Sequence, residues 1–149
     1  MKHKGIRIAL ASIETFIGLG AVGGGIAILL GVFDRWFPVV WLHGTPFSDY
    51  TIPGLVLLIV VGGGMLLAAA TQLVRRTWAV LLSMAMGFVM LGWIACEVAI
   101  IDRYAQAIVP STIVQQILFP VLGLVIIGLA AYLWKTEYRG HTLLRGQHA

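Results

Sequence analysis

Two glutamates, Glu14 and Glu97, lie inside long apolar stretches of this sequence, and their chemistry most needs an explanation. An ionised carboxylate inside a lipid bilayer costs at least about 2.5 kcal/mol, so such a residue normally faces a partner or water, or keeps its proton. Three interpretations stay open for each glutamate. It forms a buried hydrogen bond or ion pair that fixes helix register, it is a site for a proton or a substrate, or it reaches the membrane interface.

Each glutamate has polar residues at a matching depth in the membrane, and these are the candidates to meet it. Since the two carboxylates are expected near opposite faces of the bilayer, they cannot form one acid/base pair, which makes a two-carboxylate hydrolase an unlikely class. The depth-matched candidates are Thr71, Gln72, Arg75 and Arg76 for Glu14, and Gln115, Gln116, Arg103 and Arg35 for Glu97.

The segment from Asp34 to Gly54 combines aromatic residues and prolines with few charges. Amphipathic rings are favoured in the headgroup layer of a membrane, so the segment is expected to cap the outer end of the protein. An aromatic belt with turn prolines is one interpretation, and a ligand or partner surface is the other. The surface candidates are Trp36, Trp41, His43, Phe47, Asp49 and Tyr50.

Several kinds of catalytic and cofactor site are excluded by the cysteine and histidine positions. Cys96 is the single cysteine of the chain, so an internal disulfide and Cys-x-x-Cys redox chemistry are impossible. The four histidines, His3, His43, His141 and His148, all lie outside the apolar stretches, so no pair of them can hold a haem inside a bilayer. We therefore expect no cofactor, no metal site and no catalytic residue of a recognised pattern.

Composition places the chain in the membrane class. Hydrophobic residues make up 60% of the 149 residues and charged residues 11%, and the mean hydropathy is +0.97. Soluble domains usually carry about a quarter charged residues. The net charge of +4 is better explained by membrane orientation than by nucleic acid, so no nucleic-acid partner is expected.

Four stretches are long enough to cross a membrane, which needs about 20 apolar residues per helix. They cover approximately 8–33, 52–74, 78–101 and 112–134. The alternation of transmembrane strands is absent. The sequence therefore predicts an all-α fold, a single four-helix transmembrane bundle over 1–149, in which the first span is a retained signal anchor.

The lysines and arginines predict the orientation of this bundle, because they concentrate on the cytoplasmic side of membrane proteins. Eight of the ten lie on one side, which puts both termini in the cytoplasm and leaves a basic cytoplasmic tail over 135–149. The aromatic loop between the first two helices then faces outward. The eight are Lys2, Lys4, Arg7, Arg75, Arg76, Lys135, Arg139 and Arg145, against Arg35 and Arg103.

Small residues at four-residue spacing predict where the helices pack, because close backbone approach drives helix association in lipid. In the first span the predicted stripes are Gly20 with Gly24, and Gly23 with Ala27 and Gly31. Packing within the chain is favoured over a homodimer interface, which stays an alternative. Ser83 with Gly87, and Gly92 with Cys96, repeat the spacing in the third span.

The loop motif W-L-x-G-T-P-F-S-D-Y-x-I-P-G, running from Trp41 to Gly54, continues into Leu55 to Gly64. This run resembles a family of small bacterial four-span integral membrane proteins, and the likeness extends through the arginine pair to Trp93–Glu97. The resemblance implies a multi-pass protein of the bacterial plasma (inner) membrane and carries over no activity and no functional residues. A carboxylate in the first of four short spans is also similar to small multidrug-resistance transporters, although their aromatic pattern is missing here.

Three functional hypotheses follow, in order of preference. The first is a non-enzymatic accessory or interaction subunit, whose partners are membrane lipid and a homo-oligomer or larger membrane complex. The second is a small proton-coupled transporter or channel that uses Glu14, Glu97 or both, with Gln72, Gln115 and Gln116 as further binding candidates. The third is an outer-surface enzyme acting on lipid or quinone through His43 and Asp49, which requires both residues to face one pocket.

Overall fold

The computed structural model describes residues 3–35, 38–74, 78–104 and 110–145, and within these ranges the regular structure is entirely helical. Four helical stretches are long and apolar enough to cross a membrane, which confirms the predicted all-helical four-span architecture and supports a multi-pass membrane protein. In chain order the elements are α1 (Lys4–Leu29), the 3₁₀ turn η1 (Val39–Leu42), α2 (Thr51–Leu55), the π-helical η2 (Val56–Gly63), α3 (Gly64–Leu73), α4 (Ala79–Tyr104) and α5 (Pro110–Arg145).

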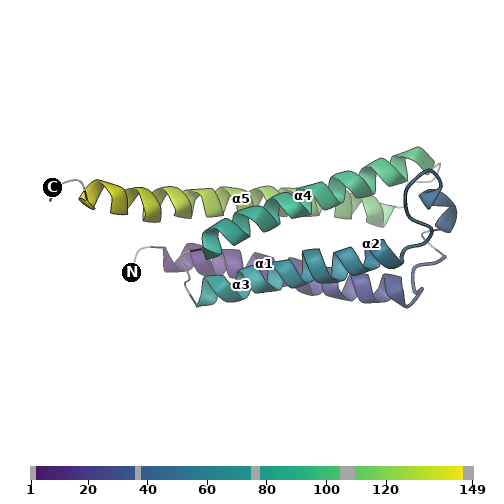
Figure 1. Cartoon of the computed structure of the whole chain (residues 1–149), viewed down its shortest axis with the longest axis horizontal. Coiled ribbons are helices and arrows are strands. Elements are labelled where there is room, and N and C mark those ends of the chain that lie inside the picture. Colours follow the sequence, from purple (N-terminus) through teal and green to yellow (C-terminus); the bar gives the residue numbers. More distant parts are fainter. Residues whose placement is uncertain (1–2, 36–37, 75–77, 105–109, 146–149) are drawn as a thin grey trace.

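The helices form two pairs. The continuous stretch α2–η2–α3 packs along α1, and α4 packs along α5, while the contacts of α3 with α4 and of α1 with α5 join the pairs. Figure 1 shows α1 beginning and α5 ending at the same end of the bundle, which we name the terminal end, and η1 at the opposite end, the loop end. Which end faces the cytoplasm is not determined by the fold.

The α1 helix packs backbone to backbone against the second span at Gly18 and Gly25. A Cβ atom added to Gly25 would lie 2.8 Å from the Leu58 backbone nitrogen and 2.9 Å from the Gly54 carbonyl oxygen. Side chains there would therefore force the helices apart. Neither predicted stripe forms the close contact, because a Cβ atom at Gly20 or Gly23 would meet nothing within 4 Å and one at Gly24 would meet only the Leu57 side chain, at 3.5 Å. The contacting glycines are seven residues apart, which places them on one α-helical face.

The π-helical winding of η2 keeps Gly54 and Gly62 on the side that faces α1. These glycines are eight residues apart, and in an α-helix eight residues rotate the chain by about 800°, which would leave Gly62 about 80° out of line. A π-helix, with its i→i+5 hydrogen bonds, turns less per residue. Consistently, an added Cβ atom would lie 3.0 Å from the Val22 backbone nitrogen at Gly62 and 3.0 Å from the Ile28 side chain at Gly54.

The α4–α5 pair also approaches closely through small residues. An added Cβ atom on Gly87 would lie 3.1 Å from the carbonyl oxygen of Gly123, so Gly87 packs as its spacing after Ser83 predicts. Gly92 and Cys96, the other predicted pair in this span, do not pack in this way, because Gly92 has open space around it and Cys96 is exposed. The face that α4 turns to the rest of the protein is therefore narrower than the sequence pattern indicates.

The first and the last spans end at residues other than those predicted. The first span ends at Leu29 rather than at residue 33, because Gly31 adopts φ +69° and the Val32 backbone N–H bonds back to the Ala27 carbonyl. This left-handed turn is a common helix C-terminus. The last helix continues beyond the predicted end at residue 134 to Arg145, so most of the predicted tail is helical.

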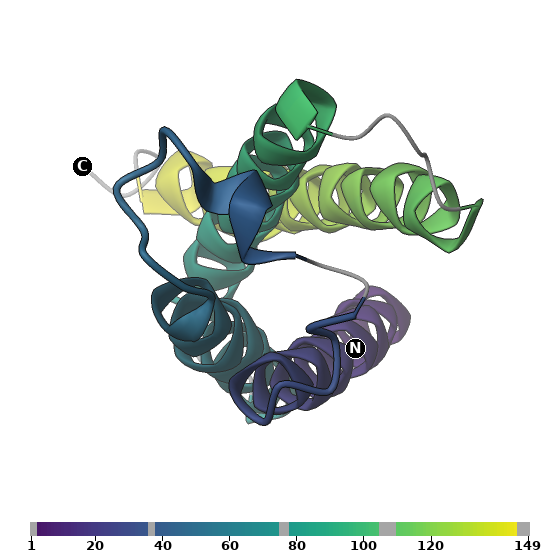
Figure 2. The same cartoon turned by 90° about the vertical axis from the view of Figure 1, so that its right-hand side faces the viewer.

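The loop between α1 and α2 covers the loop end of the bundle (Figure 2). Its η1 turn contacts α4, and Leu42 on this turn is buried. Two of the hydrogen bonds in the loop involve the residues just before α2. The Tyr50 hydroxyl donates to the Pro38 carbonyl at 3.2 Å, and the Thr51 backbone N–H donates to the Asp49 carboxylate at 2.8 Å, where α2 begins. The loop therefore lies at one end of the bundle, and its place on the outer side of the membrane stays a prediction.

Candidate functional site

Glu14 lies on the face of α1 that packs into the bundle, and it is completely buried. Its neighbours on that face are Leu10, Ala11, Ile17 and Gly18, which follow the helical repeat of three and four residues. Neither carboxylate oxygen has a hydrogen-bond partner among the residues that the structure describes. A buried polar group without a partner is rare in proteins, so Glu14 is the strongest candidate for a site.

A chain of hydrogen bonds runs from the terminal end of the bundle to the neighbourhood of Glu14. It starts at Glu137 on α5, whose carboxylate forms an ion pair with Arg7 on α1. Arg7 Nη1 then donates to the Gln72 side-chain oxygen at 2.8 Å, and Gln72 Nε2 donates to Ser83 Oγ at 2.9 Å. These four residues, which we name the polar chain, come from α5, α1, α3 and α4, so every span contributes one member.

Burial increases along the polar chain. The Glu137 side chain is 27% exposed and that of Arg7 is 11% exposed, whereas Gln72 is 1% and Ser83 0% exposed. The Ser83 hydroxyl lies beside the Glu14 carboxyl group, although its geometry falls short of a hydrogen bond. Polar groups therefore lead from the rim of the terminal end to the buried glutamate.

Apolar residues follow Glu14 in the direction of the loop end. Ile17, Ala21, Val61 and Met65 are buried in this part of the core, and all belong to one hydrophobic cluster. The described part of the chain therefore gives Glu14 polar neighbours on the side of the terminal end and packed hydrocarbon on the other side. This asymmetry means that a proton or small ion has a polar approach to Glu14 from one end only.

The residues expected at the depth of Glu14 are only partly brought together. Gln72 and Thr71 are buried at this level of the bundle, as their depth predicts. However, Gln72 bonds to Arg7 and Ser83, and the Thr71 hydroxyl donates to the Ala68 carbonyl of its own helix. The other two candidates, Arg75 and Arg76, lie outside the described residues.

Glu97 forms a weaker candidate site on α4, towards the loop end. Its side chain is half-buried, and the Trp93 indole one turn earlier is beside it. Gln115 is exposed and Gln116 half-buried on α5, and within the described residues no hydrogen bond joins either amide to Glu97. Arg35 is exposed, and the Arg103 side chain lies outside the described part. In the described part of the chain, the residues predicted to meet Glu97 are therefore not joined to it by hydrogen bonds as the members of the polar chain are joined to one another.

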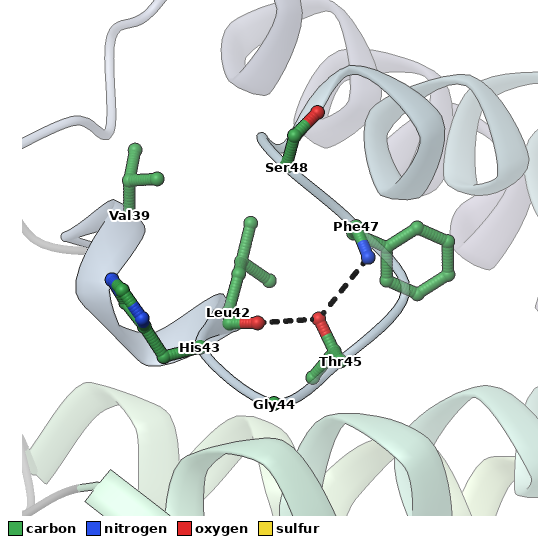
Figure 3. Close-up of a pocket in the computed structure, with 7 residues that line it drawn as sticks. All are labelled: Val39, Leu42, His43, Gly44, Thr45, Phe47 and Ser48. Carbon is green, nitrogen blue, oxygen red and sulfur yellow. Dashed lines mark hydrogen bonds between the residues drawn. The ribbon is translucent and has the colours of Figure 1, made fainter.

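Two of the outer-loop candidates, His43 and Phe47, line a small open cavity of about 270 Å³. Figure 3 shows Thr45 joining the two sides of this turn, since its hydroxyl donates to the Leu42 carbonyl at 2.7 Å and accepts from the Phe47 backbone N–H at 3.3 Å. The cavity is lined by Val39, Leu42, His43, Gly44, Thr45, Phe47 and Ser48.

An acid/base pair of His43 and Asp49 is not formed at this cavity. His43 lines it, but Asp49 does not and is instead used by the Thr51 backbone N–H at the start of α2. That hydrogen bond holds the pKa of Asp49 below its ordinary value, and burial raises the pKa of Tyr50. Of the remaining surface candidates Trp41 is half-buried, and Trp36 lies outside the described residues.

Three members of the polar chain were not identified as site residues from the sequence. The sequence pattern presents Arg7 only as an orienting charge and Ser83 only as a small packing residue, and Glu137 lies beyond the predicted end of the last span. One signal is present in the sequence: Glu137 is the single acidic residue after position 102, in a segment otherwise basic. This signal does not identify Arg7 as the partner of Glu137.

Comparison with models of protein families, with curated proteins and with solved structures found no match for this chain. The function is therefore argued from the geometry of Glu14 and the polar chain.

Proposed function

We propose that this chain is a small multi-pass membrane protein that binds and releases a proton at Glu14, as a proton-coupled carrier or channel does. The observation that carries the proposal is the complete burial of a carboxyl group without a hydrogen-bond partner in the described structure. Glu14 forms no ion pair among the described residues, so the stability of an ion pair does not explain why a glutamate lies at this position. Intramembrane carboxyl groups of this kind typically belong to proton relays and ion pathways.

The polar chain supports proton access from the terminal end. The distribution of lysines and arginines favours the cytoplasm as the side that this end faces, and the resemblance favours the bacterial plasma membrane. On this proposal Glu14 exchanges protons with the cytoplasm in the arrangement described here. Transport would require a second arrangement, in which the packed core on the other side of Glu14 opens.

A hydrophobic carbodiimide tests the proposed proton site, because it adds to protonated carboxyl groups in apolar surroundings and not to ionised ones. The full chain in lipid nanodiscs would be treated with dicyclohexylcarbodiimide across pH 5 to 9, and the modified residue identified by mass spectrometry. We expect modification at Glu14 that decreases with rising pH and is absent in Glu14→Gln. The matched control is Glu97→Gln, which leaves modification at Glu14 unchanged.

Proton flux gives the functional readout. Proteoliposomes with an internal pH dye and an imposed pH gradient should lose the gradient faster with the native chain than with Glu14→Gln, at equal reconstitution. A folded native protein whose Glu14 is not modified at any pH, and which dissipates no gradient, would contradict the proposal. The two glutamine variants also separate Glu14 from Glu97 as the site.

A second candidate, an accessory or interaction subunit, is favoured by the outer loop. Val39 and Val40 on η1, in the loop between the first two spans, are 51% and 55% exposed, and a partner protein would cover these apolar side chains. Val39→Ser with Val40→Ser should then weaken association of the chain with itself or another membrane protein, measured by crosslinking in native membranes. A chain that is monomeric and free of crosslinked partners would remove this candidate.

A further inference from the structure

The polar chain has a fixed direction. The guanidinium group of Arg7 can only donate hydrogen bonds, so the Gln72 group at 2.8 Å from it must be the amide oxygen. The Gln72 amide nitrogen therefore faces Ser83 and donates to its Oγ at 2.9 Å. Because the Ser83 oxygen accepts this bond, its hydroxyl hydrogen stays available for another acceptor. From Arg7 through Gln72 to Ser83, each hydrogen bond is consequently donated in the direction of Ser83.

We propose that Arg7, Gln72 and Ser83 are positioning residues that set the proton affinity of Glu14 and couple it to Glu137 at the rim of the bundle. The inference rests on the proposed function of Glu14 as a proton site. The Ser83 hydroxyl lies beside the Glu14 carboxyl group and is the donor available to its ionised form. Gln72 holds this hydroxyl in place, and Arg7 holds Gln72.

The charges at the two ends of the polar chain act on Glu14 with opposite signs. The positive charge of Arg7 stabilises the ionised form of Glu14, both directly and through the aligned amide and hydroxyl dipoles. The negative charge of Glu137, paired with Arg7, partly cancels this effect. A change that neutralises Glu137 therefore strengthens the influence of Arg7 on Glu14, although Glu137 lies at the far end of the chain.

No other described charge competes for this position. On α1 the remaining titratable groups near the terminal end are His3, which contacts the Tyr132 ring, and Lys4, which is exposed. On α5 they are Tyr132 itself and Lys135, both exposed. The described residues of α3 and of the first turns of α4 contribute only uncharged polar groups at this level, from Thr71, Gln72 and Ser83.

The test is an infrared pH titration of the protonated carboxyl band of Glu14 in the full chain in nanodiscs, with Glu14→Gln assigning the band. Ser83→Ala removes the donor and should move the titration midpoint to higher pH by about one unit, a tenfold change in proton affinity. Glu137→Gln should move the midpoint to lower pH. The matched control is Thr71→Val, which removes a buried hydroxyl bonded within its own helix and should leave the midpoint unchanged.

The opposite signs distinguish this inference from a general loss of packing, which would move all midpoints alike. If Glu14 titrates in the native chain but Ser83→Ala and Glu137→Gln leave its midpoint unchanged, the coupling is wrong and the proposed function stands. If no Glu14 band titrates between pH 5 and 9, the proposed function and the inference both fail. Should Ser83→Ala not fold, the midpoint of Glu137→Gln decides, since that residue lies at the partly exposed rim.

Discussion

Replacing Gly25 by alanine should separate the first two spans, and the size of the effect can be derived from the structure. The new Cβ atom would lie 2.8 and 2.9 Å from backbone atoms of the second span. Ordinary van der Waals contacts are about 3.5–4.0 Å, so the helices must move apart by more than half an ångström. Backbone cannot rotate out of the way as a side chain can. We expect a loss of about 1–3 kcal/mol in the free energy of unfolding, as for other overpacked positions.

Gly23→Ala is the matched control, because it makes the same chemical change two residues earlier in the same helix. An added Cβ atom there meets nothing within 4 Å. Both substitutions gain the same helix propensity, about 0.5–1 kcal/mol over glycine, so that gain cancels in the comparison. The difference between the two variants therefore measures the cost of the close approach alone.

The assay is reversible unfolding in mixed micelles with increasing sodium dodecyl sulfate, followed by circular dichroism. Gly25→Ala should unfold at a lower detergent fraction than the native chain, and Gly23→Ala at an equal or higher one. Equal unfolding midpoints for the two variants would refute the backbone contact between α1 and the second span. Reversed midpoints would instead indicate that Gly23 and Ala27 lie on the packed face, as their four-residue spacing predicts.

Three further outcomes are expected. Arg7→Gln should lower the free energy of unfolding by about 1–3 kcal/mol, because it leaves the buried Gln72 oxygen without its charged donor; the same detergent titration measures this. Leu42→Ala should cost about 2 kcal/mol or more, since Leu42 is 3% exposed beneath the loop, and increased proteolysis of the loop would accompany it. The hydrogen bond from Thr51 lowers the pKa of Asp49 below 3.8. Its stabilisation is therefore present at neutral pH and disappears as the pH falls through that lowered pKa, and acid unfolding of Asp49→Asn should lack this component.

The four long apolar helices and the position of a carboxyl group within the first of them could be predicted from the sequence, because both depend on local properties. Hydrophobic length alone identifies a span, and a carboxylate inside one is conspicuous without knowledge of its neighbours. The depth of Thr71 and Gln72 was predictable for the same reason, since depth follows from counting residues along a helix. The hydrogen-bond partners of these residues could not be predicted from their depth.

The glycine contacts and the polar chain could not be predicted, because both depend on rotation about the helix axes and on where helices end. The four-residue spacing of Gly20 and Gly24 is as regular as the seven-residue spacing of Gly18 and Gly25, and of the two only the second pair closely approaches the backbone of a neighbouring helix. Likewise Glu137 meets Arg7 only because α5 continues past residue 134. A basic segment with one acidic residue does not by itself indicate a helix.

The π-helical stretch of the second span has a consequence for insertions and deletions. The glycines of α1 that contact this span are seven residues apart, and those of the span itself are eight apart. The segment from 56 to 63 thus holds one residue more than an α-helix needs to present Gly54 and Gly62 on one face. Deleting the exposed Ile59 should let this segment relax to an α-helix with its contacts intact, whereas a deletion within α4 would rotate one half of that helix away from its neighbours.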